Sequence, residues 1–451
     1  MSERNTQKYQ YPKRLPIIKF FLNAEQIRKD PIPFHRRFFD TYGDTFSVKI
    51  GRRKHLLLSR DKEVVKHILK KNHKNYYKST IQSKYLSKYL GMGLLTADGP
   101  FWLRQRRLIQ PAFHKQKMDS LVGLMQQTIQ QELADVPTGT AVDVFPITNQ
   151  LAFNVVATSL FNLSVDEQTL DRLQYIIQQI QLFLVKEVRL LHKGWWFKLS
   201  GQVRKHQKLA QENRTIVRKI IEDRKASGEV HNDLLDMLLA TRYEDTGEPM
   251  STKQLIDEIS ILFVAGHETT ANALAFTAYL LAKHPTIQER VFLEVRHAGE
   301  QSEDLLEQIR SMPYTRAVID ESMRLFPPAW ITDRENLEDD SLGEYRIEKR
   351  TLVGVSFYEL HRNPNYWEAP DEFRPERFLG PAKKDTADIY YPFGAGPRMC
   401  IGMGFAVYEM VLAIAELVRN YRFTTQVKEP KLNALITLKP IGLELTFDKR
   451  T

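Results

Sequence analysis

The sequence contains a single cysteine, Cys400, among 451 residues. One cysteine excludes an intrachain disulfide and any site built from several thiolates, such as a structural zinc site or an iron–sulfur cluster. A secretion signal is also lacking, because residues 1–11 are polar, and no run approaches the roughly 18 uninterrupted apolar residues of a membrane span. We therefore expect a cytoplasmic, soluble protein without a transmembrane anchor.

Internal repeats, low-complexity tracts and Gly/Ser linkers are absent too, so nothing marks a boundary between domains. The 42% of hydrophobic residues and 27% of charged residues suit a large buried core and exclude disordered, collagen-like and coiled-coil classes. Lys and Arg number 65 against 55 Asp and Glu, a net charge of +10 that would attract an acidic partner. We predict one domain over residues 1–451, with residues 1–22 as an N-terminal extension.

Apolar spacing predicts a mainly helical chain with a small β part. Strands are expected at 45–50 and 54–59 around Gly51, and a helix at 61–71. The pattern from 101 to about 334 is overwhelmingly helical. Strands are again expected at 345–347, at 351–356 and near 435–447, whereas prolines and aromatics make 363–392 irregular.

The longest predicted helix begins at a capping box formed by Ser251 and Gln254 and ends before Pro285. Its apolar flanks indicate burial, yet the polar stretch 266–270, Gly-His-Glu-Thr-Thr, interrupts them. Glycine and threonine at this point are expected to loosen the backbone ladder and leave room for a ligand or water, where Glu268 could shuttle a proton. A zinc-protease motif would need a second histidine where Ala271 stands, so we set it aside. The alternative to such a site is a polar helix segment whose hydrogen-bonding groups are paired with neighbouring residues.

Two further segments supply charged side chains. Glu321 and Arg324 are separated by one helical turn and can pair, and 373–378 adds Arg377 in a proline-flanked stretch. A buried charge network is one interpretation, and an ordinary surface pair is the other.

The segment 393–402, Phe-Gly-Ala-Gly-Pro-Arg-Met-Cys-Ile-Gly, leads directly into an apolar helix expected at 403–418. A lone thiolate at a helix N-terminus is stabilised by the helix dipole and suits axial ligation of haem iron. The glycines permit a tight turn close to a flat macrocycle, Phe393 can shield the sulfur, and Arg398 can reach a carboxylate. The alternatives are an inert buried cysteine and a nucleophilic thiol, for which no histidine lies nearby in the sequence to act as base.

These segments together resemble the cytochrome P450 family of haem-thiolate monooxygenases. Residues 393–402 fill every fixed position of its F-x-x-G-x-R-x-C-x-G motif, and 265–270 match its oxygen-activation motif. Glu321 and Arg324 match its E-x-x-R pair, with Arg377 as the third member. Trp102 and Arg106 match its W-x-x-x-R motif. The four motifs stand in family order, so the resemblance extends over nearly the whole chain. Together with the absence of a membrane span, it leads us to expect a soluble, bacterial-type member of the family.

The resemblance implies a single, mainly α domain of triangular outline with a small β part and a long central helix. It implies haem b, with Cys400 as axial iron ligand, and insertion of one oxygen atom from O2 into a C–H bond. Glu268 and Thr269 would deliver protons, while Glu321, Arg324 and Arg377 would be structural. The implied haem contacts are Trp102, Arg106, Ala265, Arg334, Phe393, Gly394, Arg398 and Gly402. A solvated loop around Arg334 is the alternative for that residue.

We expect no fused reductase, so electrons from NAD(P)H are expected to arrive through a separate, acidic ferredoxin or flavodoxin. Basic residues around the Trp102 helix would receive it, or would form a solvated helix face: Arg104, Arg107, Lys115 and Lys117. We expect a monomer that binds no nucleic acid. The rival functions are an H2O2-using peroxygenase of the same fold, which would tend to lack the acid–threonine pair, and a non-catalytic haem sensor or electron carrier.

The substrate is not readable from the sequence beyond its apolar character. The family's substrate-contacting stretches correspond here to largely apolar residues: Leu94, Leu95, Leu182, Phe183, Trp330, Ile331, Leu435 and Ile436. A fatty acid, a terpenoid and a polyene all fit such a lining. The run 328–331, Pro-Ala-Trp-Ile, resembles some bacterial carotenoid-hydroxylating members.

Overall fold

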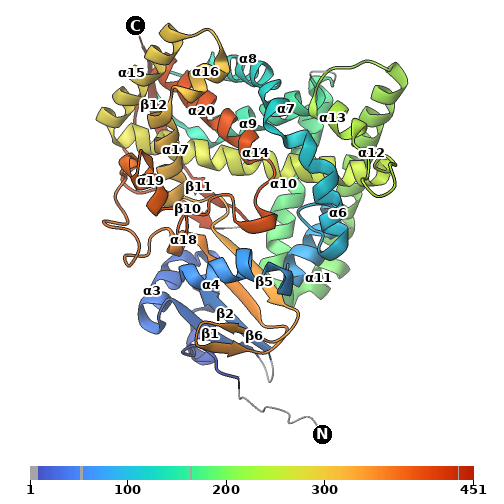
Figure 1. The fold of residues 1–451 in the computed structure, drawn as a ribbon, viewed down its shortest axis with the longest axis vertical. Coiled ribbons are helices and arrows are strands. Elements are labelled where there is room, and N and C mark those ends of the chain that lie inside the picture. The colour runs from blue at the N-terminus through green and yellow to red at the C-terminus, as the bar shows by residue number, and fades with distance from the viewer. Residues whose placement is uncertain (1–8, 51–53, 163–164, 435, 451) are drawn as a thin grey trace. The chain divides into compact units, whose positions relative to one another are not determined.

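A computed structural model describes residues 9–50, 54–162, 165–434 and 436–450. Helices dominate, and the strands gather into a few small sheets (Figure 1). The chain forms two compact units. Unit 1 comprises 1–79, 324–372 and 381–400, and unit 2 comprises 80–323, 373–380 and 401–451. The expectation of a mainly α fold with a small β part is confirmed.

Unit 1 is built on a five-stranded sheet with strand order β1-β2-β8-β5-β3. Strands β1 and β2 are antiparallel, whereas β2 and β8 are parallel. The two predicted strands around Gly51 are confirmed at their predicted ends. The strands of unit 1 are β1 (Thr45–Ile50), β2 (Lys54–Ser59), β3 (Tyr76–Tyr77), β5 (Ile331–Asn336), β6 (Asp340–Leu342), β7 (Tyr345–Ile347) and β8 (Leu352–Ser356).

Alternation along β2 divides the core of unit 1 between the two faces of this sheet. Leu57 packs with Val353 and Val355 of β8 on one face, whereas Leu58 packs with Phe46 of β1 on the other. Residues 10–15, part of the predicted extension, attach to this unit: Leu15 is fully buried, and its N–H donates to the Ser47 carbonyl at 2.8 Å.

Unit 1 also contains short helices. Asp61 caps α4 by accepting from the N–H groups of Glu63 and Val64, and a π-helical turn, His67–Lys71, completes the predicted helix at 61–71. The helices of unit 1 are α1 (Ile17–Leu22), α2 (Ala24–Lys29), α3 (Ile32–Tyr42), α4 (Lys62–Lys66), α18 (Phe357–Leu360) and α19 (Ala382–Asp385).

Unit 2 contains most of the helices. They are α5 (Ser87–Leu90), α6 (Gly99–Ile109), α7 (Lys115–Asp119), α8 (Val122–Leu133), α9 (Val144–Phe161), α10 (Glu167–Arg189), α11 (Gly194–Leu199), α12 (Gln202–Ser227), α13 (Leu234–Ala240), α14 (Thr252–Lys283), α15 (Pro285–Gln301), α16 (Leu305–Arg310) and α20 (Met403–Asn420). Helix α17 (Pro313–Leu325) continues from unit 2 into unit 1. The remaining strands are β4 (Ala141–Asp143), β9 (Tyr421–Thr424), β10 (Lys431–Ala434), β11 (Leu438–Ile441) and β12 (Glu444–Lys449).

The long helix α14, yellow in Figure 1, confirms the predicted start and end. Ser251 accepts from the Gln254 N–H at 3.2 Å, but the Gln254 side chain binds Met92 and Glu258, so only half of the capping box forms. The helix is continuous through 266–270, where Thr269 and Thr270 donate to carbonyls one turn earlier. The expected loosening of the ladder is therefore not observed.

Helix α14 packs against α9, α12 and α20. Gly266 permits the contact with α9, because a Cβ there would lie 3.1 Å from a Val156 methyl group. By length and composition, α9 is the one described helix that could cross a membrane, and 72% of it is buried inside the protein. Such burial favours a core helix of unit 2.

Several strands fall outside the expectations, among them β3, β4, β5, β6 and β9. The helical pattern was expected to continue to about residue 334, but the last helix of that stretch ends at Leu325. Residues Ile331–Asn336 form β5 instead, because pairing with β3 and β8 overrides the helical pattern. The short strand β4 pairs with β12, which is distant in the sequence.

Candidate active site

The axial-ligand candidate lies in the loop that ends unit 1. Cys400 is exposed, three residues before α20 begins, and its N–H donates to the Phe393 carbonyl at 2.9 Å. This hydrogen bond folds the segment 393–400 into a compact turn. The exposed position excludes the inert buried cysteine.

Two glycines shape this turn in different ways. Gly394 and Gly396 have φ of 70° and 68°, a region that favours glycine. A Cβ on Gly396 would overlap the carbonyl oxygen of Leu69, so this glycine is required by the protein's own packing. Gly394 has open space around it. Gly402 is the N-cap of α20, and Arg398, half-buried, ends the short helical turn Gly396–Arg398.

In unit 2, the middle of α14 exposes a small stripe within an otherwise buried helix. Ala265 is exposed, and Thr269, one turn later, is partly exposed and donates its hydroxyl to the Ala265 carbonyl at 2.8 Å. His267 points into the core instead. Its Nδ1–H donates to the Phe263 carbonyl at 2.7 Å, and burial lowers its pKa to about 4, so it is neutral. The stripe thus offers a hydroxyl and a small apolar surface.

Glu268, next to Thr269, is half-buried and makes its contacts with other parts of unit 2. Gln181 of α10 donates from Nε2 to Glu268 Oε2 at 3.0 Å. Burial raises the pKa of Glu268 above its ordinary 4.5, and the charge of Lys439 on β11 opposes that rise. Sequence reasoning missed Gln181 and Lys439; a lysine between apolar residues of a predicted strand was the available signal for Lys439.

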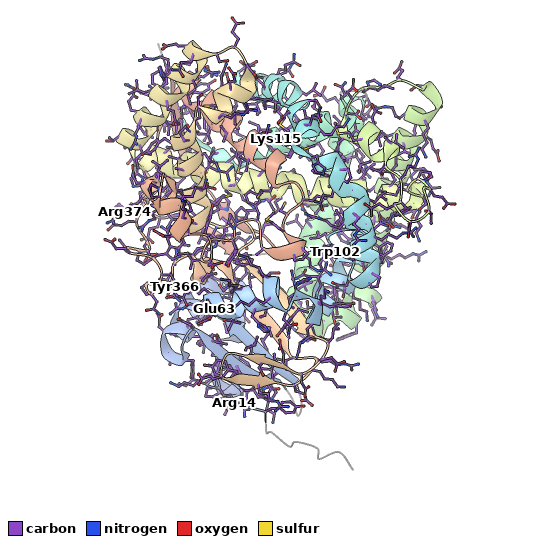
Figure 2. All side chains as sticks on the ribbon, viewed as in Figure 1. Arg14, Glu63, Trp102, Lys115, Tyr366 and Arg374 are labelled. Atoms are coloured by element: carbon purple, nitrogen blue, oxygen red, sulfur yellow. The ribbon has the colours of Figure 1, made fainter. Side chains whose placement is uncertain are left out.

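The arginine and tryptophan residues predicted to contact haem belong to different units. Trp102 is buried on α6 of unit 2 (Figure 2), with Arg106 one turn later on the same face. Arg334 lies in unit 1 on β5, only 8% exposed, and its Nη1 donates to the Asp333 carbonyl at 2.6 Å. The alternative of a solvated loop around Arg334 is therefore wrong.

Glu321 and Arg324 are both fully buried, which rules out an ordinary surface pair. In unit 2, Glu321 accepts from the Arg374 N–H at 2.9 Å and pairs with Arg377 at 3.4 Å. In unit 1, Arg324 donates to three backbone carbonyls at 2.7–3.0 Å, those of His361, Pro370 and Glu372.

The predicted substrate residues have different environments. Phe183 is buried and stacks on His206 with ring centroids 3.9 Å apart, and Trp330 is buried beside His35. Both side chains thus pack as core residues, which sequence reasoning did not foresee. Leu94, Leu95 and Ile331 are half-buried, whereas Leu182 and Ile436 are exposed. Leu435 lies outside the described residues.

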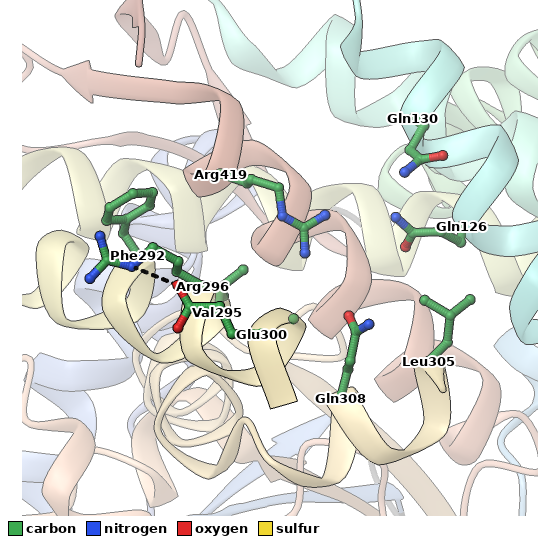
Figure 3. A pocket seen from close by; sticks show the side chains of 10 residues that line it. Gln126, Gln130, Phe292, Val295, Arg296, Glu300, Leu305, Gln308 and Arg419 are labelled. Carbon is green, nitrogen blue, oxygen red and sulfur yellow. Dashed lines mark ion pairs between the residues drawn. The ribbon is translucent and has the colours of Figure 1, made fainter. Parts of the chain in front are cut away.

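A pocket of about 540 Å³ lies elsewhere in unit 2, among α8, α15, α16 and α20 (Figure 3). Its lining includes the ion pair of Arg296 and Glu300, with nitrogen and oxygen 3.6 Å apart. The predicted site residues are not among the described residues that line it. This pocket is separate from the predicted chemistry.

The donor types present fit haem. An exposed thiol offers the soft ligand that iron takes in haem-thiolate proteins. Guanidinium groups on Arg106 and Arg398 suit carboxylates such as haem propionates, and Ala265 exposes a small apolar side chain.

Comparison with known proteins agrees with this chemistry. The family model of cytochrome P450 matches residues 10–447. Protein LUTEIN DEFICIENT 5, chloroplastic, of Arabidopsis thaliana is 32% identical over 98% of this chain and 78% of its own length. Cyclooctat-9-en-7-ol 5-monooxygenase of Streptomyces melanosporofaciens is 31% identical over 84% of this chain and 83% of its own length. Carotene epsilon-monooxygenase, chloroplastic, of Arabidopsis thaliana is 30% identical over 85% of this chain and 75% of its own length. The chain belongs to the cytochrome P450 family.

Proposed function

We propose that this protein is a soluble, bacterial-type monooxygenase that inserts one atom of O2 into a C–H bond of an apolar substrate. The observation that carries the proposal is that one P450-family chain contains three groups: an exposed thiol on Cys400, the hydroxyl of Thr269 and the carboxyl of Glu268. When bound, haem b supplies oxygen activation and electron transfer.

The other roles in this proposal belong to the chain's own residues. In this proposal Cys400 would ligate the iron, and Arg106, Arg334 and Arg398 with Trp102 would hold the propionates. Thr269 holds a proton at its hydroxyl. Because burial raises the pKa of Glu268, its carboxyl keeps a proton to higher pH than an exposed glutamate would, so more of it is in the protonated form that can act as a donor.

Electrons in this proposal come from NAD(P)H through a separate acidic ferredoxin or flavodoxin. Arg107 and Lys117 are exposed on α6 and α7 and support docking of such a partner. Arg104 and Lys115 contribute less, because they form ion pairs with Asp245 at 3.1 Å and with Asp119 at 2.9 Å.

For the substrate, we propose a terpenoid or polyene ahead of a fatty acid. Two relatives carry names that describe oxygenation of such molecules, a carotene and cyclooctat-9-en-7-ol. The exposed Leu182 and Ile436 and half-buried Leu94 support an apolar substrate.

The test compares oxidant sources. NAD(P)H and O2 consumption is measured with a supplied ferredoxin chain, and product formation is measured with H2O2 alone, for a panel of apolar compounds chosen by a low-to-high-spin Soret shift. We expect product only with the redox chain. Product from H2O2 alone at the same rate would instead identify a peroxygenase, and no product in either assay would favour a sensor or electron carrier.

A further inference from the structure

The segment 87–97, called here the α5–α6 loop, consists of α5 and the residues that follow it, and it carries two of the predicted substrate residues, Leu94 and Leu95. It belongs to unit 2 together with α10, α12 and α14. A loop that contacts substrate must be held in one shape if it is to select among substrates. The hydrogen bonds that hold this loop in place therefore bear on substrate selectivity.

Two buried carboxylates of α14 hold the centre of the loop. Asp257 Oδ2 accepts from the Met92 N–H at 3.1 Å, and Glu258 Oε2 accepts from the Leu94 N–H at 3.0 Å. The exposed fractions are 4% for Asp257 and 1% for Glu258. Hydrogen bonds from backbone N–H groups to a buried carboxylate are charge-assisted and stronger than neutral ones.

The glycines of the loop make this approach possible. A Cβ on Gly91 would overlap the carboxylate of Asp257, and a Cβ on Gly93 would lie 2.6 Å from Glu258 Oε2. The two glycines of the loop thus face two adjacent carboxylates of the helix: Gly91 faces Asp257, and Gly93 faces Glu258. Any larger residue at either position would force the facing carboxylate or the loop to move from this arrangement.

Neighbouring side chains fix these carboxylates. Gln254 Nε2 donates to the Met92 carbonyl at 2.7 Å and to Glu258 Oε1 at 3.0 Å. Arg214 of α12 pairs with Asp257 at 3.3 Å.

A third buried carboxylate ties the start of the loop to α10. Glu187 accepts from Lys88 Nζ at 2.6 Å and from the Tyr89 hydroxyl at 2.8 Å. The ring of Tyr89 lies edge-on to Phe183, another α10 residue, with centroids 6.1 Å apart. The loop is thus attached to two helices, and through Asp257 to α12.

We propose that Glu187, Asp257 and Glu258 are positioning residues that set substrate selectivity by clamping the α5–α6 loop onto α10 and α14. The proposal deepens the proposed function and rests on it, because it assumes that Leu94 and Leu95 contact the substrate. The three carboxylates act on substrate only through the loop.

The clamp itself is tested by amide hydrogen exchange of the intact haem-loaded protein. Glu258→Gln keeps the side-chain shape but replaces a charged acceptor, and Asp257→Asn does the same at Met92. We expect the amides of Leu94 and Met92, respectively, to exchange about 10- to 100-fold faster, the equivalent of one charge-assisted hydrogen bond. Unchanged exchange in both variants would overturn the clamp.

Glu294→Gln is the matched control. Glu294 also accepts from backbone N–H groups, those of Tyr314 and Thr315 at 2.7 Å, but it holds the start of α17. This variant should leave exchange in the α5–α6 loop unchanged.

Selectivity is tested with two azoles that bind haem iron directly, imidazole as a small probe and clotrimazole as a bulky one. Glu258→Gln and Glu187→Gln should change clotrimazole affinity by about tenfold and leave imidazole affinity within about twofold, whereas Glu294→Gln should change neither. Faster exchange with unchanged clotrimazole affinity would overturn the selectivity role. Failure of the unmodified protein to give any azole spectrum would instead contradict the proposed function.

Discussion

At the scale of single residues, Thr269 is distinguished from its neighbour by exposure. Both Thr269 and Thr270 donate to carbonyls one turn earlier, at 2.8 and 3.0 Å, but only Thr270 is buried. Thr269→Ala should therefore retain bound haem and divert electrons into peroxide, with a severalfold lower yield of product per NAD(P)H. The measurement is peroxide and product per NAD(P)H consumed.

Thr270→Ala is the control for this prediction, because it removes the same helical hydrogen bond without touching the exposed stripe. It should couple electrons to product as the unmodified protein does. Equal coupling in the Thr269 and Thr270 variants would refute the role in proton delivery.

Glu409 on α20 is a buried acid whose two carboxyl oxygens have no hydrogen-bond partner among the described residues. Burial raises its pKa well above 4.5, so the folded protein keeps a proton that the unfolded chain loses above about pH 4.5. Between the two pKa values, stability falls as pH rises, by about 1.4 kcal/mol per pH unit from this group. Glutamine carries no such proton, so the stability of Glu409→Gln relative to the unmodified protein should increase from pH 5 to pH 7.

Urea unfolding midpoints at the two pH values measure this difference. The exposed Glu300→Gln should show the pH dependence of the unmodified protein. Parallel pH profiles for Glu409→Gln and the unmodified protein would mean that Glu409 is ionised in the folded state.

At the scale of elements, Arg324 joins the end of α17 to the irregular segment 361–372 through the carbonyls of His361, Pro370 and Glu372. Its guanidinium also lies 5.0 Å from the centroid of the Trp367 ring. Arg324→Ala strands these buried acceptors, and we expect a loss of about 3–5 kcal/mol with little soluble haem protein. Thermal unfolding and haem content per chain are the measurements.

The exposed Arg296→Ala is the comparison, and it should change stability by less than about 0.5 kcal/mol. A soluble Arg324→Ala protein with an unchanged melting temperature would show that the buried hydrogen bonds of Arg324 contribute little.

Elements with strong local signals were predictable from sequence, β8 among them, whereas some of the strands formed by distant pairing were not. The apolar patterns of 45–50 and 54–59 and the ends of α14 are encoded by nearby residues, so these two strands and that helix were placed correctly. Strand β5 depends on pairing with β8, which a local pattern does not reveal. The π-helical turn after α4 likewise has no local signal that we recognise.

The same distinction holds for the site. Motif spacing identified Cys400, Thr269 and Glu268 as candidates, because each belongs to a short contiguous pattern. Gln181 and Lys439 reach Glu268 from elements far away in the sequence, so no window of sequence contains both partners. The carboxylate clamp on the α5–α6 loop was missed for the same reason.

At the scale of the whole molecule, the central claim is that this P450-family chain holds haem through its single cysteine. The most direct measurement is the absorption spectrum of the reduced, CO-bound protein and of its Cys400→Ser variant. The unmodified protein should show the band typical of a haem-thiolate, and the variant should lose that band because no other thiol exists in the chain. A thiolate-type band retained in Cys400→Ser, or absent from the haem-loaded unmodified protein, would contradict the account.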